Sequence, residues 1–545
     1  MIYDFLIIGS GVAATALTER LLEKDRSASI LILEAGRRVK TKDFALWQEH
    51  LVRDTLPYND CKDLKYPDDP RNPDNDEENR SSGETKVDLR GARLFVYGGS
   101  TMAWGGWSLR LKPEDFLLRS NTGQGADWPF SYDVLEEYYC QAERHLAVSG
   151  NSSDTTVRRS ERYPFPHFPY TFEDKPVADA MDRLGITFGN MPIARRGYSD
   201  VPSDVPSRHA PCHTTGTCDY CPFGAKYVAT NYLDDIRSWT DCPRLEVRLD
   251  AVVETINTSS KTRATSVTYT DSATRETISV EAERIIIAAG AIESAKLLQR
   301  SKPAHWPNGI GNDSGHVGAN FVTHPLVIFN SPTQSNPDKL QPELDFPTLI
   351  SRHFDTKAEQ EAGKFMIINP PNHVDVNLAA QFRNGMTRVA IDAYVAKPFH
   401  RALHCYVEVF GKSINTISNL EDCRNTFKML ETEVHFSYET MNDRVNQIAL
   451  VVAQIYDAMG ISEPQNLTRT IKWGAHHAAS TCRMSVDPRD GVVDSDLKVH
   501  GMENLYVCSN AVFPSIGAVN PTLTLTALAL RLGDHLNGNR VRNDA

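Results

Sequence analysis

The chain has 545 residues, of which 41% are hydrophobic and 23% charged, and its formal net charge is −12. This length and composition are typical of a globular protein with about two to four domain-sized units. The negative charge argues against nucleic acid as a partner, because proteins that bind it need a basic face.

We expect a cytoplasmic protein without a membrane span. No run of about 18 apolar residues occurs. The first predicted strand begins at residue 3, which leaves no room for a signal peptide. Ten cysteines in this length do not form a dense disulfide framework, and a reducing compartment suits them.

Residues 3–36 form the first predicted unit. An apolar strand, YDFLII, is followed by the glycine turn GSGVAA, the amphipathic helix TALTERLLEK and a second strand, SILILEAG. Gly9, Gly11 and Ala14 form a GxGxxA pattern, in which the backbone approaches a pyrophosphate and the helix packs closely on the strand. Glu34, at the end of the second strand, is placed to accept hydrogen bonds from ribose hydroxyls. The unit predicts a dinucleotide site that disfavours NADP but does not separate NAD from FAD.

Residues 59–90 are rich in Asp, Asn, Pro and charged side chains. Such a segment cannot bury enough apolar surface to fold alone, so we expect a mobile surface loop. The alternative is a lid that covers a bound ligand, because loops of this kind often carry function.

A second glycine-rich segment, GGSTMAWGG, spans residues 98–106. Glycines at these positions would let backbone amides reach a flavin or its phosphates. The alternative is a loop that only packs against the first glycine turn.

The remaining elements are mixed. Residues 116–205 include the helical stretch SYDVLEEYYCQAERHLAV, and strand patterns over 245–287 end in RIIIAAGAIESAKLLQRS, a strand, a small turn and a helix. Residues 326–470 predict strands at TRVAIDAYVA and TEVHFSYET and then a long helix at NQIALVVAQIYDAMG. Because the nucleotide-type elements are scattered from end to end, we expect a discontinuous cofactor domain.

The last predicted helix lies in VNPTLTLTALALRLGDHL and follows Asn520 and Pro521. Its N-terminus carries a partial positive charge, which suits the negative charge of a reduced flavin. Asn520 and Pro521 fit equally well an ordinary N-cap followed by proline at the first helical position. The sequence alone leaves both interpretations open.

His476 and His477 lie side by side in WGAHHAASTCRM. Oxidation of an alcohol removes a hydride from carbon and a proton from oxygen, and a base with a near-neutral pKa beside the hydride acceptor suits the second task. An adjacent amide such as that of Asn520 would orient the hydroxyl. The residues alone do not decide which ring is the base, and a purely structural role for both is the alternative.

Cys212, Cys218 and Cys221 form a cluster, with His209 and His213 close by in the sequence. Three thiolates at this spacing fit zinc or an iron–sulfur cluster, but the cysteines do not complete a four-ligand pattern. Reduced thiols in a turn near the cofactor are the simpler interpretation, so we predict no metal site.

Taken together, these motifs resemble the glucose–methanol–choline (GMC) flavoprotein oxidoreductases over almost the whole chain. The resemblance rests on YDFLIIGSGVAA with LILEAG, YGGSTMAWGG, IIIAAGAIESAKLLQRS, VGANFVTHP at 317–325, and a tail with HAASTCRM, GVVDSDLKVHGMENLYVCSNAVFP and NPTLT. Within the family, YGGSTMAWGGWSLRLKPEDF and DWPFSYDVLEEYYCQAE are most similar to sugar dehydrogenases of the gluconate, fructose and glucose dehydrogenase type. The NPTLT tail is also similar to pyranose and glycoside 3-oxidases.

The resemblance implies an α/β chain, mixed α+β in detail, with the GMC fold. We expect a Rossmann-like FAD-binding domain from residues 1–115, 206–325 and 471–545, and an inserted sheet-plus-helices substrate domain from 116–205 and 326–470. The implied activity is FAD-dependent oxidation of a CH–OH group of a sugar or glycoside to a carbonyl. The implied electron acceptor is oxygen, a quinone or a redox protein.

The resemblance also separates the two histidines. The family's catalytic histidine stands seven residues before the Met of a GTxRM-like motif, and counting back from Met484 gives His477. Its implied partner, a His or Asn before the final helix, is Asn520. His477 would take the hydroxyl proton while the hydride passes to flavin N5, and Asn520 would orient the hydroxyl. His476 would be a supporting or core residue.

Two further sets of contacts are expected. The expected substrate contacts in the inserted segment are His435 and Tyr438. The expected FAD contacts are Gly9, Gly11, Ala14, Glu34, Gly98, Gly99, Ser100, Thr101, Trp104, Gly105, Val252, Ala289, Ser509, Asn510 and Thr522.

Three positions depart from the family pattern. Met102 stands where some members carry a histidine that tethers the flavin, so we expect non-covalent FAD. Ser509, within VCSNA, replaces an aspartate that contacts FAD. The CDYC spacing is one residue shorter than in the iron–sulfur sugar dehydrogenases of the family, which weakens that interpretation.

Alternative functions remain at this point. A sugar dehydrogenase with an iron–sulfur cluster at Cys212, Cys218 and Cys221 would pass its electrons to a redox partner. In other classes, the same fold would serve a non-redox lyase or an FAD-binding escort protein.

Overall fold

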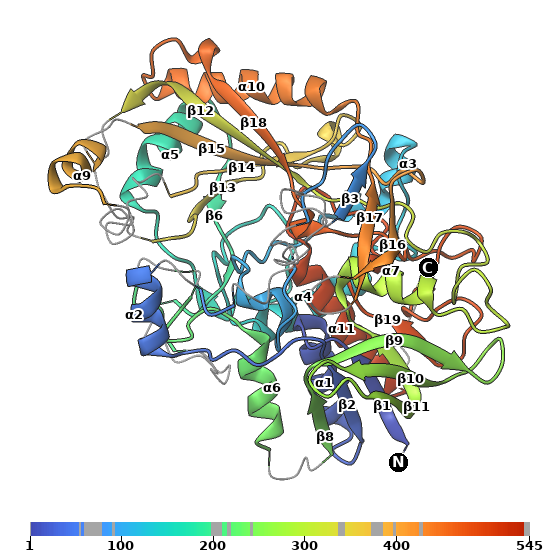
Figure 1. Cartoon of the computed structure of the whole chain (residues 1–545). Helices are drawn as coiled ribbons and strands as arrows, with labels where there is room; N and C mark the ends of the chain where they lie inside the picture. The colour runs from blue at the N-terminus through green and yellow to red at the C-terminus, as the bar shows by residue number, and fades with distance from the viewer. Residues whose placement is uncertain are drawn as a thin grey trace.

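The structure is a computed structural model, and two large sheets organise it (Figure 1). The described residues are 2–53, 56–58, 79–89, 93–197, 210–214, 218, 220–239, 244–335, 344–371, 385–395, 399–424 and 429–538. Within these ranges, no helix is both long and apolar enough to cross a membrane. Residues 59–78 of the predicted surface loop lie outside the described residues.

The first large sheet contains the nucleotide-type elements. In spatial order its strands are β8 (Leu245–Arg248), β2 (Ile30–Leu33), β1 (Tyr3–Ile8), β11 (Thr277–Ile287), β10 (Ala264–Asp271) and β9 (Ala251–Thr258), with β19 (Leu505–Val507) paired to β11. β8, β2, β1, β11 and β19 run parallel, whereas β10 and β9 are antiparallel. The apolar runs of β1 and β2 are almost entirely buried, as expected of parallel strands covered on both faces.

The helices of the described chain are distributed over both sheets (Figure 1). They are α1 (Val12–Lys24), α2 (Phe44–Arg53), α3 (Leu118–Thr122), α4 (Tyr132–His145), α5 (Lys175–Arg183), α6 (Ala229–Arg237), α7 (Gly290–Arg300), α9 (Arg388–Val395), α10 (Met441–Ala458) and α11 (Thr522–Leu536). Short 3₁₀ turns near the site are η2 (Gly99–Met102), η3 (Pro113–Leu117), η7 (Ala475–His477) and η8 (Asn510–Val512).

Helix α11 brings the C-terminal part of the chain back to the N-terminal unit. It packs against α1 and α4 and is buried continuously from Leu523 to Gly533, as its small and apolar residues predict. A Cβ at Gly533 would lie 2.5 Å from Cγ of Arg20 on α1, so glycine permits the close approach of the two helices. The two ends of the sequence therefore enclose the same region.

The second large sheet is antiparallel. Its strands, in spatial order, are β18 (Thr468–Trp473), β12 (Pro325–Ser335), β15 (Phe399–Val407), β14 (Phe365–Ile368), β13 (Leu349–Ser351) and β6 (Gly189–Asn190). Helix α10 packs on β12 and on α5. Apolar side chains of both large sheets belong to one continuous core. The expected division into two discontinuous domains stays a prediction.

Two small sheets complete the fold. One contains β16 (Thr416–Arg424), β17 (Leu430–His435) and β3 (Asn79–Ser82), and the other β5 (Phe165–Pro166), β4 (Val148–Gly150) and β7 (Ile193–Ala194). β3 belongs to the segment predicted as a loop, and Val87 and Leu89 just after it are buried. The loop prediction therefore differs from the structure over residues 79–89, because a polar strand can form when it pairs with an existing partner, here β17.

One predicted strand is wrong. The stretch TRVAIDAYVA forms helix α9, with Ile391 buried and Val389 exposed. Ile391 and Val395 also have the i, i+4 spacing of a helix. A short apolar run of this kind therefore fits both the two-residue period of a strand and the 3.6-residue period of a helix.

A group of buried charges lies where β14 and β15 meet η3. Lys364 is fully buried and contacts the carboxylates of Asp115 and Asp355, the latter at 2.9 Å. Burial opposes ionisation of Asp355, but Arg352 and Lys364 outweigh it and hold the pKa of that carboxyl well below its usual value. Burial also raises the pKa of the neighbouring Glu408 to about 8. One lysine thus keeps two carboxylates compatible with the interior.

We expect Lys364→Met to lower the free energy of unfolding by about 3–5 kcal/mol, because it leaves Asp115 buried without its cation. Urea unfolding of the variant and the wild type measures the difference. The matched control is Lys261→Met, which removes an exposed pair with Asp313 and should cost about 0–1 kcal/mol. Equal, small effects of the two substitutions would contradict a stabilising role for the buried charges.

Candidate active site

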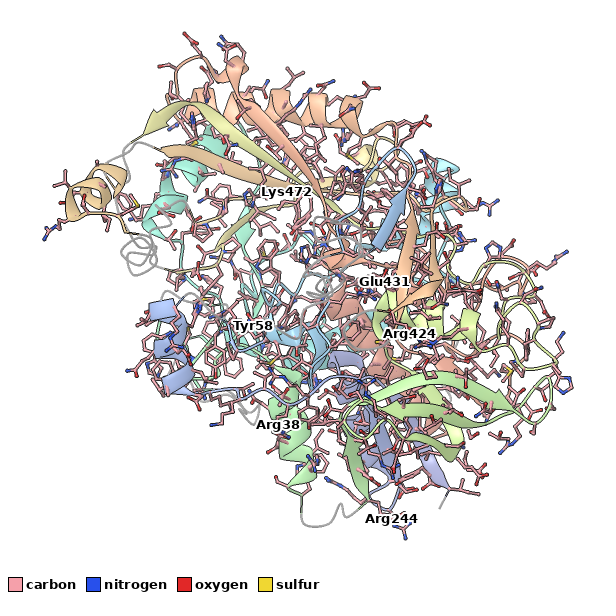
Figure 2. All side chains as sticks on the ribbon, in the orientation of Figure 1. Arg38, Tyr58, Arg244, Arg424, Glu431 and Lys472 are labelled. Atoms are coloured by element: carbon pink, nitrogen blue, oxygen red, sulfur yellow. The ribbon has the colours of Figure 1, made fainter. Side chains whose placement is uncertain are left out.

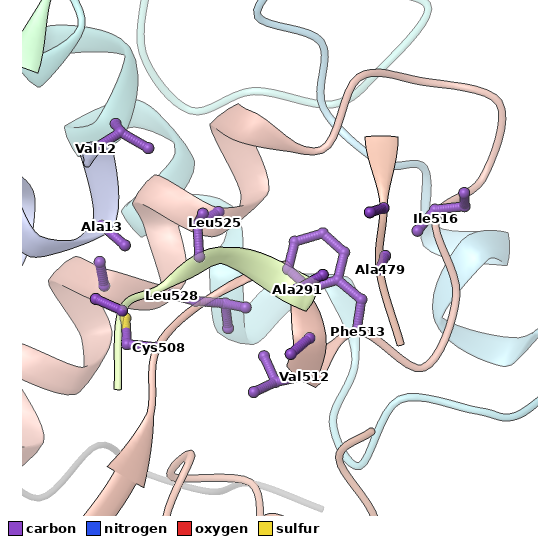
Figure 3. Packing of buried hydrophobic residues seen from close by; sticks show 14 of the residues in the cluster. Val12, Ala13, Ala291, Ala479, Cys508, Val512, Phe513, Ile516, Leu525 and Leu528 are labelled. Atoms are coloured by element: carbon purple, nitrogen blue, oxygen red, sulfur yellow. The ribbon is translucent and has the colours of Figure 1, made fainter. Parts of the chain in front are cut away.

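A cavity of about 280 Å³ lies at the carboxyl ends of β1, β2 and β11. It is bordered by the glycine turn at 8–13, by the end of β2 at 33–35, by the start of η2 and by the turn at 288–293 that leads into α7. Ligands of open parallel sheets bind at this edge, beyond the carboxyl ends of the strands. Buried apolar side chains that border it come from α1, α7, α11 and the residue after β19, among them Val12, Ala291, Leu525 and Cys508, which pack in one cluster (Figure 3).

Glycines shape the wall of the cavity next to α1. Gly9 has φ +97°, and a Cβ there would lie 2.7 Å from the carbonyl oxygen of Ala288. A Cβ at Gly99 would lie 3.2 Å from Cα of Gly11, so the two glycine segments touch each other. A Cβ at Gly11 itself would meet no atom within 4 Å. The free space in front of Gly11, at the N-terminus of α1, therefore fits a phosphate group.

Glu34 joins the two glycine segments. Its carboxylate accepts hydrogen bonds from the backbone N–H and the hydroxyl of Ser10, at 3.0 and 2.6 Å, and from the N–H of Gly36, at 2.9 Å. The Ser10 hydroxyl in turn accepts from the N–H of Gly98 at 2.9 Å. Burial raises the pKa of Glu34 to about 7, although these hydrogen bonds oppose the shift. Glu34 borders the cavity, where its remaining acceptor capacity suits a ribose hydroxyl.

Most of the residues expected to contact FAD border this cavity. They are Gly9, Gly11, Glu34, Gly99, Ser100, Thr101, Trp104, Ala289, Ser509, Asn510 and Thr522. The structure does not bring Ala14, Gly98, Gly105 or Val252 to its wall. Ala14 is fully buried in α1, and Ala251 and Val253 line the cavity in place of Val252.

Sequence reasoning missed the far end of the cavity, which Arg93, Glu293, Arg300 and Met429 border. Arg93 Nη1 lies 2.6 Å from Glu293 Oε1, and Lys296 Nζ lies 2.8 Å from the same oxygen. Burial opposes ionisation of Glu293, but Lys296 and Arg93 outweigh it and lower its pKa to about 2. Glu293, Lys296 and Arg300 share helix α7, which the sequence predicted, but Arg93 and Met429 reach this wall of the cavity only through long-range packing.

His477 is held by a chain of short polar contacts. Its Nδ1 lies 3.0 Å from Nδ1 of His324, and its Nε2 lies 2.9 Å from Nδ2 of Asn520. Nε2 of His324 lies 2.7 Å from the carbonyl oxygen of Gly517. Four segments meet here: η7, the residue before β12, the loop at 517 and the residue before Pro521. His477 is 9% exposed, so its ring is almost closed off from water.

The pKa values of the two rings reflect this enclosure. Burial lowers the pKa of His324 to about 4. Burial, the neighbouring His324 and His476 hold the pKa of His477 well below its usual value. Both rings are therefore neutral at pH 7, and a neutral imidazole has one nitrogen that can accept a proton.

The structure decides between the two interpretations of Asn520. Helix α11 begins at Thr522 with Pro521 as the residue before it, and no side chain caps the helix. Asn520 is therefore not an N-cap, and its amide nitrogen contacts His477 instead. The Oδ1 atoms of Asn520 and Asn510 are buried and have no hydrogen-bond partner among the described residues. Such oxygens suit a bound molecule, because an unsatisfied buried acceptor is costly.

His476 differs from its expected supporting or core position. Its side chain is exposed, although the residue borders the cavity together with Ala475 and Ala478. Of the two adjacent rings, it is His477 that contacts both Asn520 and His324. The small residues behave as expected: Ala478 borders the cavity, and Ala479 is fully buried behind it.

The second sheet supplies a wall beside His477 that sequence reasoning missed. The ring of Tyr406, on β15, lies 5.0 Å from that of His477 and 6.0 Å from that of Trp107. Lys472, which Figure 2 labels, is on β18. It shares the face of Tyr406, because Leu326 on β12 pairs with both residues. Burial and the charge of Lys472 lower the pKa of His404, two residues before Tyr406, to about 4. Half-buried His404 and Tyr406 alternate with buried Cys405, but this alternation does not show which segment the face meets.

The two expected substrate contacts lie elsewhere. Nδ1 of His435, on β17, lies 3.1 Å from the Ser82 hydroxyl, and the Tyr438 hydroxyl accepts from the N–H of Phe410 at 3.3 Å. The structure gives neither side chain a contact with His477. A role for these two side chains in substrate binding stays a prediction.

The cysteine cluster surrounds an arginine. Nη1 of Arg195 lies 3.2 Å from Sγ of Cys218, and Nζ of Lys226 donates to the carbonyl oxygen of Cys218 at 3.3 Å. Arg195 and Lys226 are each only 2% exposed. Burial raises the pKa of the Cys218 thiol to about 11. In the described part of the chain, no group of three or more His, Cys, Asp or Glu is arranged to hold a metal ion, and His209 lies outside that part.

Comparison with known proteins gives consistent matches. Two models described as GMC oxidoreductase match residues 191–326 and 419–529. The chain is 27% identical over 552 residues to the fructose dehydrogenase large subunit of Gluconobacter japonicus, covering 97% of each. It is 24% identical over 553 residues to 6'''-hydroxyparomomycin C oxidase of Streptomyces lividus, covering 99% and 93%. A formate oxidase variant of Aspergillus oryzae shares the fold with a TM-score of 0.64 at 15% identity, covering 99% and 98%.

Glycine turns at the edge of a parallel sheet, next to an enclosed histidine, are the features of a flavin-dependent oxidoreductase. The chain belongs to the GMC oxidoreductase family, whose members bind FAD and act on CH–OH donors. The resemblance and the fold class are thereby confirmed. The relatives named above are a dehydrogenase and an oxidase, which supports an oxidoreductase over the non-redox lyase and the FAD-binding escort.

We expect Gly11→Val to reduce the amount of FAD that copurifies with the protein by about tenfold or more, equivalent to about 1.4 kcal/mol of binding. The added side chain would enter the free space in front of Gly11, and the φ of −71° at this position accepts valine without strain. Flavin absorbance per chain measures the effect. The control is Gly189→Val on β6, a glycine with ordinary backbone that does not border the cavity, and it should keep its FAD. Full FAD content in Gly11→Val would contradict the phosphate position.

Proposed function

We propose that the chain oxidises a CH–OH group of a sugar or glycoside to a carbonyl, with FAD as cofactor and His477 as the base. The observation that carries this proposal is the contact of neutral His477, through Nε2, with the amide of Asn520. Asn520 lies two residues before Thr522, which borders the cavity. The sugar class is supported by the names of two relatives, a fructose dehydrogenase and a 6'''-hydroxyparomomycin C oxidase.

The residues around the cavity fit FAD. Gly11 leaves room for the pyrophosphate and Glu34 is placed for a ribose. Asn510, whose Oδ1 is free, and the start of α11 at Thr522 border the same cavity. Met102, at the position where a tethering histidine would stand, is buried among apolar side chains. A thioether in such a cluster does not form a flavin bond, which supports non-covalent FAD.

FAD, His477 and Asn520 have separate roles in the proposed reaction. FAD, when bound, supplies the hydride acceptor at its N5 atom. Nε2 of His477 accepts the proton of the hydroxyl as the carbon of that hydroxyl gives up its hydride, so a carbonyl remains. The Asn520 amide, 2.9 Å from Nε2, orients the hydroxyl, and its free Oδ1 can accept a second hydrogen bond from the substrate. The enclosure of His477 keeps water from competing for the same nitrogen.

We place the sugar against the second sheet rather than beside His435 and Tyr438. Tyr406 and Trp107 offer aromatic faces next to His477, and Lys472 adds a hydrogen-bond donor on the same face as Tyr406. A sugar ring presents apolar C–H groups as well as hydroxyls, and such a mixed wall suits both.

We expect anaerobic addition of sugars and glycosides to bleach the flavin of the wild type and not of His477→Ala. Loss of a positioned base should slow flavin reduction by about 10²–10⁴-fold while FAD stays bound. Stopped-flow absorbance measures the rate, and flavin absorbance per chain measures binding.

The matched control is His476→Ala, which removes the adjacent, exposed ring and should reduce the flavin at nearly the wild-type rate. The assignment fails if His476→Ala loses the activity and His477→Ala keeps it. The sugar class fails if no sugar or glycoside of a broad panel bleaches the wild-type flavin.

An iron–sulfur cluster is the second candidate, and the charges around the cysteines favour it in one respect. Arg195 and Lys226 would offset the negative charge of thiolates in a buried site. As placed, however, the cysteines do not fit a cluster, because the Arg195 guanidinium itself contacts Cys218. The described cysteines are free thiols, which supports a reducing, cytoplasmic compartment. The proposed electron acceptor remains oxygen, a quinone or a redox protein.

We expect no stoichiometric iron or zinc in the purified protein, because a guanidinium next to the thiols repels a metal cation. Metal and acid-labile sulfide analysis of the yellow holoprotein tests this. Three or four irons per chain, lost in Cys218→Ser, would replace this expectation with the cluster and an electron-transfer partner.

A further inference from the structure

We propose that His324 is a positioning residue that fixes the proton of His477 on Nδ1 and so leaves Nε2 unprotonated, the form in which it acts as the base. The inference rests on the proposed function, because it assigns a role within the same reaction. Three contacts carry it: Gly517 with His324, His324 with His477, and His477 with Asn520.

The first contact sets the proton of His324. A backbone carbonyl oxygen only accepts hydrogen bonds, and that of Gly517 lies 2.7 Å from Nε2 of His324. Nε2 must therefore carry a hydrogen and donate it, since a lone pair at this distance would repel the oxygen. Because the ring is neutral, it has only one N–H, so Nδ1 of His324 is an acceptor.

The second contact, between His324 and His477, determines which nitrogen of His477 carries the hydrogen. The two Nδ1 atoms lie 3.0 Å apart, and one of them must donate. Since Nδ1 of His324 accepts, Nδ1 of His477 donates, and the single N–H of neutral His477 is used. Nε2 of His477 then bears a lone pair, and the donor amide of Asn520 at 2.9 Å agrees with this assignment.

The Gly517 carbonyl can determine the proton position on His324 because the loop that contains Gly517 is held in place. A Cβ at Gly517, which has φ +54°, would lie 2.9 Å from Oδ1 of Asp115. The Ser515 hydroxyl donates to the carbonyl oxygen of Asp115 at 2.7 Å and accepts from Nε1 of Trp128 at 2.8 Å. The loop at 515–517 is thus held against η3.

The same arrangement predicts the pH dependence. The titratable groups that face His477 are His324, its neighbour His476 and Tyr406 on β15, and Asp355 acts on His324. The low pKa of His477 keeps Nε2 unprotonated at pH 7, so the rate falls only when the pH drops below that pKa. His324 contributes to lowering it, so its removal raises the pKa and moves the acid limb of the rate to higher pH.

Two substitutions at His324 separate positioning from packing. His324→Asn puts an amide oxygen near the position of Nδ1, so it can still accept from His477, and we expect at least about a third of the wild-type rate of flavin reduction, with an acid limb at higher pH. His324→Leu removes the acceptor, and we expect a loss of about 10- to 100-fold at every pH, part of what a positioned base contributes. FAD content should not change in either variant. The control His316→Leu removes a ring that contacts the carbonyl oxygen of Arg489, and it should behave as wild type.

Neutron diffraction of the perdeuterated wild-type holoenzyme reads the protons directly and does not depend on activity. We expect deuterium on Nδ1 of His477 and on Nε2 of His324, and none on Nε2 of His477. Deuterium on Nε2 of His477, or a His324→Leu variant with unchanged rate and pH profile, overturns the proposal. If no sugar reduces the wild type while the deuterium positions are as expected, the proposed substrate fails and the positioning stands.

Discussion

The carbonyl oxygen of Gly517 determines which nitrogen of His324 carries a hydrogen, and buried charges hold this carbonyl in place. Asp115, which the Gly517 loop touches, is held by Lys364, and Lys364 also contacts Asp355. An ion group of this kind tolerates little displacement, because each carboxylate would be left unpaired in a medium of low polarity. Stability and chemistry are therefore coupled. The buried ion group that stabilises the interior beside the second sheet also holds the loop that positions His324 and, through it, His477.

The cofactor cavity depends on a second constraint, the contact of two backbones at Gly11 and Gly99. A Cβ at Gly99 would lie 3.2 Å from Cα of Gly11, so glycine at position 99 permits this approach, and Ser10 and Glu34 bridge the same two segments. The contact joins residues about ninety positions apart, and α11 adds the C-terminal segment from the other side. A chain whose cofactor elements are separated by long insertions can still form one cavity, since each segment is anchored to the first sheet rather than to its sequence neighbour.

These two constraints explain how much the sequence could predict. Gly9, Gly11 and Glu34 were recognisable because their roles are local: a turn, a helix start and a strand end. His477 became distinguishable from His476 only through the family spacing to Met484. His324, Tyr406 and Arg93 were missed as site residues, because their roles arise from which strand faces which segment, and no local period encodes that. The same limitation applies to His435 and Tyr438, which the structure does not bring into contact with His477. A short apolar run that fits the periods of both a strand and a helix made α9 a predicted strand.

The two adjacent histidines show why position in the fold, rather than residue type, makes a base. Both rings belong to one 3₁₀ turn, yet His476 is exposed while His477 is enclosed by His324, Tyr406 and Asn520. Burial lowers the pKa of His476 as well, so the pKa alone does not distinguish the two rings. His477 differs in its contacts with His324 and Asn520, which engage both of its nitrogens and leave one tautomer. Because the acceptor on Nδ1 is another neutral ring and not a carboxylate, no countercharge stabilises the protonated base. The proton taken from the substrate is therefore held weakly, and its release to solvent does not have to overcome an ion pair.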